Sequence, residues 1–184
     1  MITTEEFIEK VEDKIDKEIE TIRNRRLTKK RRRLLSGIED YTLLTKNLGV
    51  FADWITVNIS SPNTPGLREL QTSATLSNFL EKINTERKII EDKKGKRLQI
   101  WLKISPDLND KDLKKLIDDA INNNVNALCI SNTSTSRPNN LKSVQKIKPG
   151  GLSGKPLFIL STKTLAKAYL HAPNEIKFIG IGGI

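Results

Sequence analysis

Cysteine, histidine and aromatic residues are scarce in this chain of 184 residues, which has one cysteine, one histidine and 5% aromatics. Cys129 alone cannot form a disulfide within the chain, and it is consistent with a reducing compartment. Cys129 and His171 are too few to supply the ligands of a zinc or iron–sulfur site. We therefore expect no metal centre.

Long apolar runs are also missing. A helix that crosses a bilayer needs about 20 consecutive apolar residues, and a secretory signal peptide needs a shorter uninterrupted apolar core. Neither pattern occurs, because charged residues interrupt the chain before an apolar segment reaches the required length. The sequence therefore predicts no membrane-spanning helix.

Positive charge is abundant, with 32 Lys and Arg against 22 Asp and Glu, a formal net charge of +10 and a pI near 9.7. Much of this excess lies in the basic run Arg23–Arg33. Such a run can contact anionic lipids or nucleic acid. No aromatic residue interleaves its charges, so a solvated, partly disordered segment is the simpler interpretation, and we expect no nucleic-acid partner.

The residues before this run have the pattern of one charged amphipathic helix. Thr3–Glu6 has the form of a capping box, and apolar residues recur every three or four positions from Phe7 to Ile22. Acidic residues crowd the other face between Glu5 and Glu20. We expect residues 1–36 to form a separate region, and one hypothesis makes it an oligomerisation or partner-binding module.

An apolar strand, Trp54–Ile59, runs directly into a cluster of small polar side chains. Pro62, Pro65 and Gly66 end the strand and restrict the loop that follows. The polar residues of this cluster are Asn58, Ser61, Asn63 and Thr64. Open-sheet and barrel α/β folds place their chemistry at the carboxyl ends of strands, although a hydrogen-bonded turn alone is the alternative.

Three more apolar strands are predicted at residues 98–104, 126–130 and 177–181, with amphipathic helices between them. We expect these helices to start near Thr72 or Ser73, at Asn109, and at Ser161 or Thr162. Strands that alternate with helices of this length form a parallel sheet. A (β/α) barrel is the natural closure, and a flavodoxin-like sheet is the alternative.

Six motifs carry a resemblance to a known family: Asn58–Arg68, Lys103–Leu108, Ser131–Thr133, Ser136–Pro138, Gly150–Leu157 and Gly180–Ile184. From about Asp40 onward, the chain resembles the dihydroorotate dehydrogenases of the quinone-dependent class. The resemblance implies a TIM barrel that contains FMN and oxidises dihydroorotate to orotate in pyrimidine synthesis, with a quinone as electron acceptor. We expect residues 37–184 to form part of such a barrel, with about four βα units, and residues 1–36 to be a segment that does not resemble the family.

The resemblance also implies a role for individual residues. Ser61 is similar to the base that removes a proton from dihydroorotate, and it stands where the cytosolic class has cysteine. The residues that correspond to substrate-binding groups are Asn58, Asn63, Asn132 and Thr133. Those that correspond to FMN-binding groups are Asn58, Lys103, Ser131, Gly154 and Gly183.

The chain departs from the family in its extent. A TIM barrel has eight strands in about 250 residues, whereas four strands are predicted here. We expect the family's first three strands, its last strand and its N-terminal helical hairpin to be missing. Peripheral association with an inner membrane, bacterial or mitochondrial, is then implied only by the family, and a soluble protein is expected if the hairpin is absent. The alternative function is an inactive remnant of a truncated or split gene.

Overall fold

The computed structural model describes residues 10–20, 34–64, 67–71 and 73–183. These residues divide into two compact units. The first takes its described residues from the ranges 1–55 and 82–99, and the second from 56–81 and 100–184. Strand β1 (Trp54–Asn58) and helix α3 (Ser73–Lys94) each contribute to both units.

The first unit is helical. Residues 10–20 are helical, as the amphipathic pattern predicts, whereas the predicted capping box and the basic run lie outside the described residues. Helix α2 (Leu34–Leu48) was not expected from the sequence, and a 3-10 turn (Gly49–Phe51) follows it. Gly49 packs closely against Ile90, since a Cβ there would come within 2.7 Å of Ile90 Cδ1 and the Ile90 side chain would have to shift. The division at residue 36 stays a prediction.

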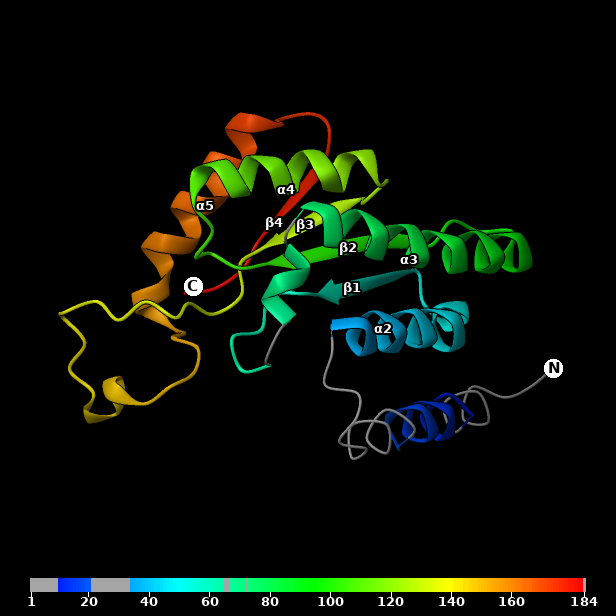
Figure 1. The fold of residues 1–184 in the computed structure, drawn as a ribbon, viewed down its shortest axis with the longest axis horizontal. Coiled ribbons are helices and arrows are strands. Elements are labelled where there is room, and N and C mark those ends of the chain that lie inside the picture. The colour runs from blue at the N-terminus through cyan, green and yellow to red at the C-terminus, as the bar shows by residue number, and fades with distance from the viewer. Residues whose placement is uncertain (1–9, 21–33, 65–66, 72, 184) are drawn as a thin grey trace. The chain divides into compact units, whose positions relative to one another are not determined.

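The second unit contains most of the sheet (Figure 1). Strands β2 (Gln99–Ile104), β3 (Ala127–Ile130) and β4 (Lys177–Gly180) are parallel, and with β1 they form one sheet in the order β1-β2-β3-β4. The register places Lys103 beside Cys129, and Cys129 beside Ile179. Because the spatial order equals the chain order, the sheet is wound in one direction as in a (β/α) barrel, and the flavodoxin-like alternative is wrong.

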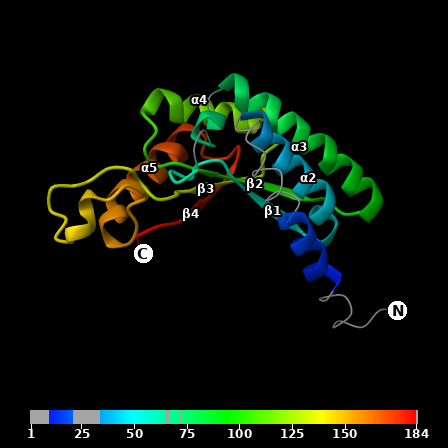
Figure 2. The same ribbon diagram turned by 60° about the horizontal axis from the view of Figure 1, so that its bottom comes forward.

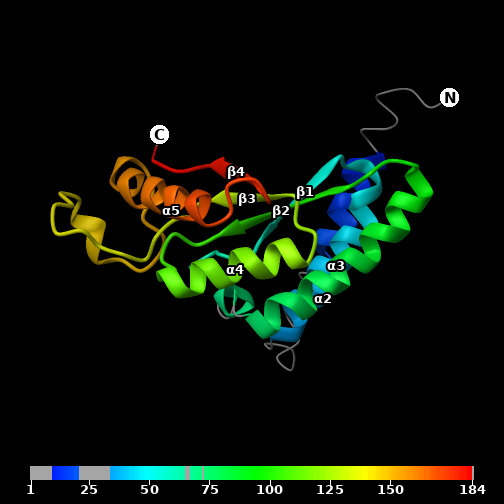
Figure 3. The ribbon, with the colours of Figure 1, turned by 90° about the horizontal axis from the view of Figure 1, so that it is seen from above.

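Helices α3, α4 (Asp110–Asn122) and α5 (Phe158–His171) connect successive strands, and α5 packs against α4, β3 and β4 (Figures 1 and 3). Asn109 caps α4 as predicted, accepting a hydrogen bond of 2.9 Å from Asp112 N. Helix α3 begins at Ser73, also as predicted, while Thr72 lies outside the described residues. The third predicted start is wrong, because α5 begins at Phe158.

In strand β2 one face is better buried than the other. In β2 the buried residues Ile100, Leu102 and Ile104 alternate with residues that are more exposed, and among these Trp101 and Lys103 are half-buried. The core of the second unit includes these apolar residues that are at most 2% exposed: Val57, Ile59, Leu70, Leu76, Phe79, Leu80, Ile100, Leu102, Ile104, Leu113, Leu116, Ile117, Ala120, Ala127, Leu128, Cys129, Ile130, Leu157, Ala168 and Ala172. Lys103 lies on the face of β2 opposite Ile100, Leu102 and Ile104.

Candidate active site

The predicted substrate-binding residues meet at the carboxyl ends of β1 and β3. Asn132 Nδ2 donates to Asn58 Oδ1 and to Ser60 Oγ, both at 3.0 Å. Ser60 Oγ in turn donates to Asn58 Oδ1, also at 3.0 Å. Two amides that are far apart in the sequence thus form one polar cluster, as the strand-end positions predict.

Ser61 lies beside this cluster, on the loop after β1. Its half-buried hydroxyl accepts from Asn63 N at 3.3 Å and from Thr64 Oγ1 at 3.4 Å. The turn interpretation is therefore correct in part, because the hydroxyl does stabilise the loop. Pro65 and Gly66, which were expected to end this segment, lie outside the described residues.

The glycine-rich loop lies against the same residues. A Cβ on Gly151 would come within 2.5 Å of Thr133 Cβ and 3.2 Å of Pro62 Cγ, so only glycine fits there. Gly150, which has a φ of 125°, lies beside Asn63, whose Oδ1 would be 3.5 Å from an added Cβ. The loop is joined to the end of β3 by two backbone hydrogen bonds between Ser134 and Leu152. It therefore forms a wall of the site.

The predicted phosphate-binding glycines lie at the beginning of α5. Gly183 has a φ of 83°, and a Cβ there would come within 2.8 Å of Phe158 Cβ. Gly154 has a φ of 72°, and the space beside it is open to 4 Å. Ser161, inside the helix and not at its cap, donates to Gly182 O at 2.9 Å and so holds the last glycines to α5. A helix N-terminus with adjacent glycines favours a phosphate group.

The side chains of Lys103 and Ser131 differ in how much of each is exposed and so accessible to a ligand. Burial raises the pKa of the Cys129 thiol, and the positive charge of Lys103, its neighbour in the sheet, opposes this shift. Lys103 is half-buried on β2, between β1 and β3. Ser131 is 2% exposed, and its hydroxyl donates to Asn132 O at 3.0 Å. That hydroxyl is thus already used within the protein.

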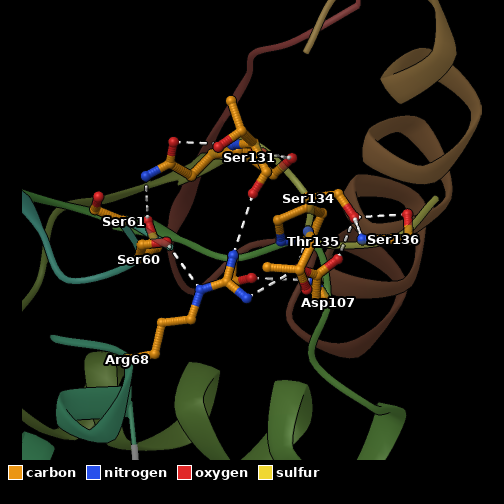
Figure 4. A network of polar contacts seen from close by, with 12 residues as sticks. Ser60, Ser61, Arg68, Asp107, Ser131, Ser134, Thr135 and Ser136 are labelled. Atoms are coloured by element: carbon orange, nitrogen blue, oxygen red, sulfur yellow. Dashed lines mark hydrogen bonds and ion pairs between the residues drawn. The ribbon is translucent and has the colours of Figure 1, made fainter. Parts of the chain in front are cut away.

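Arg68 was not singled out from the sequence, yet it joins three parts of the site (Figure 4). It lies in a 3-10 helix, Leu67–Gln71, that follows the Ser61 loop. Its Nε donates to Ser60 O at 3.2 Å, and its Nη2 donates to Thr133 O at 3.3 Å. Its Nη1 forms an ion pair of 2.9 Å with Asp107 Oδ2. One side chain thus contacts the loops that follow β1, β2 and β3.

Asp107 is the second member of this network. Its carboxylate accepts from Ser134 Oγ at 2.5 Å, from Thr135 N at 2.9 Å and from Thr135 Oγ1 at 3.0 Å. Burial alone would raise the pKa of Asp107, but the hydrogen bonds from Ser134, Thr135 and Arg68 outweigh it and lower the pKa. Arg68 and Asp107 both stand inside motifs that we recognised, but nothing in their spacing indicates that they pair.

A second arginine fixes the long loop before the glycines. The guanidinium of Arg137 donates to the carbonyls of Thr135 and Ser136 at 3.2 and 3.0 Å, and to Lys146 O at 3.1 Å. Its Nη2 donates to Lys148 O at 3.0 Å and to Gly150 O at 2.8 Å. The loop that it closes extends away from the sheet (Figure 2). Arg137 therefore ties the glycine-rich segment to the end of β3.

In the part of the chain that the structure describes, acidic, cysteine and histidine side chains nowhere gather in groups of three or more that could hold a metal ion. None of the helices in that part is both long and apolar enough to cross a membrane.

Comparison with known proteins shows strong similarity over most of the chain. The family model described as dihydroorotate dehydrogenase matches residues 3–184. The dihydroorotate dehydrogenase (quinone) of Agrobacterium fabrum is 41% identical over 147 residues, which cover 80% of this chain and 40% of that protein. The corresponding protein of Bartonella tribocorum is 44% identical over 147 residues, covering 80% of this chain and 41% of that protein.

Solved structures show the same relationship. The crystal structure of DHODH from Eimeria tenella in complex with ferulenol superposes with a TM-score of 0.76 at 33% identity, covering 80% of this chain and 43% of that one. The ligand-free structure from the same organism gives a TM-score of 0.75 at 34% identity and covers 44% of that chain. The chain thus spans about two-fifths of the length of the relatives that it matches.

Proposed function

The chain belongs to the dihydroorotate dehydrogenase family, and we propose that its site binds FMN and oxidises dihydroorotate to orotate, with a quinone as the final electron acceptor. The observation that carries this proposal is the polar cluster of Asn58, Ser60 and Asn132 beside Ser61. The names of the curated relatives, which specify a quinone, support the choice of acceptor.

The amide cluster fits a pyrimidine ring. Each amide offers a donor and an acceptor, which is what the alternating carbonyl and N–H groups of a dihydropyrimidine dione require. Asn132 Nδ2 and Asn58 Oδ1 bond to each other here, and both groups are only partly buried, so substrate can replace this contact. Thr133 and Asn63 complete the proposed substrate pocket, each lying against the glycine-rich loop.

The residues present also fit FMN. Gly154 and Gly183 lie where a phosphate would face the N-terminus of α5, and a Cβ on Gly183 would fill that space. Lys103, half-buried on β2, carries a positive charge that would stabilise negative charge on a bound flavin ring. Asn58 and Ser131 are proposed to line the same cofactor site. When bound, FMN supplies the acceptor for the hydride that leaves C6 of dihydroorotate.

Ser61 is the proposed base. It removes the proton from C5, so that loss of this proton and of the hydride forms the ring double bond. A serine hydroxyl is a weak base, and its efficiency depends on passing the proton onward. Thr64 Oγ1 donates to Ser61 Oγ at 3.4 Å, and reversal of this hydrogen bond would make Thr64 the next hydroxyl along such a path. The loop geometry thus supports a role for Ser61 in proton transfer as well as in the turn.

We also propose peripheral association with an inner membrane, because a quinone acceptor partitions into lipid. Sedimentation of the purified chain with vesicles of neutral and anionic phospholipid tests this point. Binding to either vesicle supports it, whereas a chain that stays in the supernatant with both is a soluble protein that must receive its quinone by diffusion.

The described strands supply part of the proposed pocket, and Trp101 and Lys103 on β2 are only half-buried in it. We therefore propose little turnover by this chain alone. The test is an FMN titration followed by flavin fluorescence, and then anaerobic addition of dihydroorotate to bleach the flavin absorbance. Binding without bleaching supports a partial site, bleaching shows a working one, and no FMN binding contradicts the proposed cofactor.

The serine is tested in the same assay. Ser61→Ala should leave the affinity for FMN unchanged and slow any bleaching by about 10²-fold or more, the usual contribution of a positioned base. Ser143→Ala, at an exposed serine that caps a 3-10 turn in the long loop, is the matched control and should not change the rate. Equal bleaching by both variants would remove Ser61 from the mechanism.

A further inference from the structure

We infer that Arg68 and Asp107 are positioning residues that hold the loop of Ser61 in register with the loop of Asn132 and Thr133. The catalytic meaning of this pair rests on the proposed function, because it assumes that Ser61 and Asn132 act on one substrate. The clamp itself rests on the contacts of the two side chains and can be tested without any reaction.

The guanidinium of Arg68 bonds to both loops and so fixes the distance between them. Its Nε and Nη2 donate to Ser60 O and Thr133 O, at 3.2 and 3.3 Å. Ser60 immediately precedes Ser61, and Thr133 immediately follows Asn132. A guanidinium is planar and rigid, so two acceptors bound by one fork are held at a fixed distance from each other.

Asp107 fixes the arginine and extends the clamp to the next residues. Its Oδ2 holds Arg68 Nη1 at 2.9 Å and also accepts from Thr135 N at 2.9 Å, while its Oδ1 accepts from Ser134 Oγ. The two charged side chains are 27% and 19% exposed, so solvent reaches the pair only in part. Loss of either partner leaves the other charged, partly buried and without its ion-pair partner.

The consequence for a reaction is geometric. If Ser61 takes a proton from a ring that Asn132 holds, a relative displacement of the two loops separates base and substrate. A misplacement of about 1 Å can reduce a rate by about 10²-fold. Neither Arg68 nor Asp107 needs to touch the substrate for this effect, which distinguishes them from Ser61 and the asparagines.

Another ion pair in the same unit provides a matched control. Lys167 on α5 pairs with Asp110 on α4 at 2.5 Å, but these side chains are 55% and 66% exposed. The contacts found for this pair join two helices and no strand-end loop. Exposed pairs of this kind contribute little to stability, and we expect Lys167→Met and Asp110→Asn to leave the site loops unchanged.

The test is hydrogen–deuterium exchange of the full chain, read by mass spectrometry on peptides that cover residues 58–64, 131–136 and 110–122. In Arg68→Met, exchange in the first two segments should rise together by about tenfold, while α4 stays protected. Arg68→Lys should behave like Arg68→Met in residues 58–64, because a lysine ammonium keeps the charge but cannot span both carbonyls. Faster exchange in one loop alone, or in neither, would overturn the clamp.

If Arg68→Met loses protection throughout the chain, the milder variant Asp107→Asn, which preserves the shape of the side chain, takes its place in the test. Selective loss of protection in residues 131–136 and 58–64 of that variant supports the clamp, whereas loss throughout, or no loss, contradicts it.

The flavin assay then separates the clamp from the proposed function. If the wild-type chain bleaches, Asp107→Asn should slow bleaching by about tenfold without changing FMN affinity; an unchanged rate removes the catalytic meaning. A wild-type chain that does not bind FMN contradicts the proposed function, and one that binds FMN without bleaching has only a partial site. In both cases the exchange result decides the clamp.

Discussion

Asn132 Nδ2 donates to Asn58 Oδ1 at 3.0 Å, although the two residues are 74 positions apart. The contact exists because β1 and β3 end at the same edge of the sheet, separated by the end of β2. It brings two residues that bind substrate in the proposed function into one cluster.

Asn132→Asp should weaken orotate binding by about tenfold or more. The new carboxylate loses the two N–H donors and adds a negative charge that repels the carboxylate of orotate, a change worth about 1.5–3 kcal/mol for a charged hydrogen bond. Isothermal titration with orotate measures this effect. Asn139→Asp, at an exposed position in the long loop, adds the same charge and should bind normally; equal weakening in both variants would show that net charge, and not the cluster, controls affinity.

Asp107 should stabilise the protein at neutral pH and lose this effect in acid. Its pKa in the folded chain lies below the ordinary value of 3.8. A carboxyl with a depressed folded pKa contributes stability above its unfolded pKa, and this is lost as the pH falls through the folded pKa. Asp107→Asn should therefore lower the free energy of unfolding by about 2 kcal/mol at pH 7, and by less once the pH falls below the ordinary value of 3.8.

Urea unfolding of both proteins across this pH range checks the prediction. Taking the difference between them cancels the acid sensitivity of other carboxyls whose pKa is also lowered, such as Glu91. A difference that stays constant down to the lowest pH would contradict the assigned role of the Asp107 charge.

Gly151→Ala should destabilise the chain, because the added methyl has no space beside Thr133 and Pro62. Overpacking of this kind costs about 1–3 kcal/mol, and a shift of the loop to relieve it should also weaken ligand binding. Gly37→Ala is a control that should change the stability in the opposite direction. It lies within α2 with nothing within 4 Å of the new Cβ, so helix propensity should stabilise it by about 0.5–1 kcal/mol. Thermal unfolding of both variants measures the two shifts.

Arg137→Met should loosen the long loop without unfolding the sheet. The variant loses all five hydrogen bonds to carbonyl groups that the arginine donates, three of them to Lys146, Lys148 and Gly150. Limited digestion with a lysine-specific protease should cut after Lys146 and Lys148 at least about tenfold faster than in the wild type. Arg97→Met serves as a control outside this loop, and an unchanged cleavage rate in Arg137→Met would show that the loop is held by other contacts.

The sequence predicted the four strands and the helices between them, because period-2 and period-3.6 patterns are local properties of the chain. The family resemblance assigned Asn58 and Asn132 to one substrate-binding set, and the structure brings these two side chains together. The sequence patterns missed helix α2 and misplaced the start of α5 by three residues, from Ser161 to Phe158. Ser161 has the type of a capping residue, but its hydroxyl instead holds Phe158 O and Gly182 O.

The sequence by itself determined the family, the alternation of strands and helices, and the residue types that gather at the strand ends. The tertiary structure alone decided which of these residues touch. The ion pair of Arg68 and Asp107 and the close approach of Gly151 to Thr133 depend on how three loops fold over one sheet edge. Such contacts join residues distant in the chain, and no local pattern specifies their distance, because loop conformation is set by packing and by hydrogen bonds from the other loops.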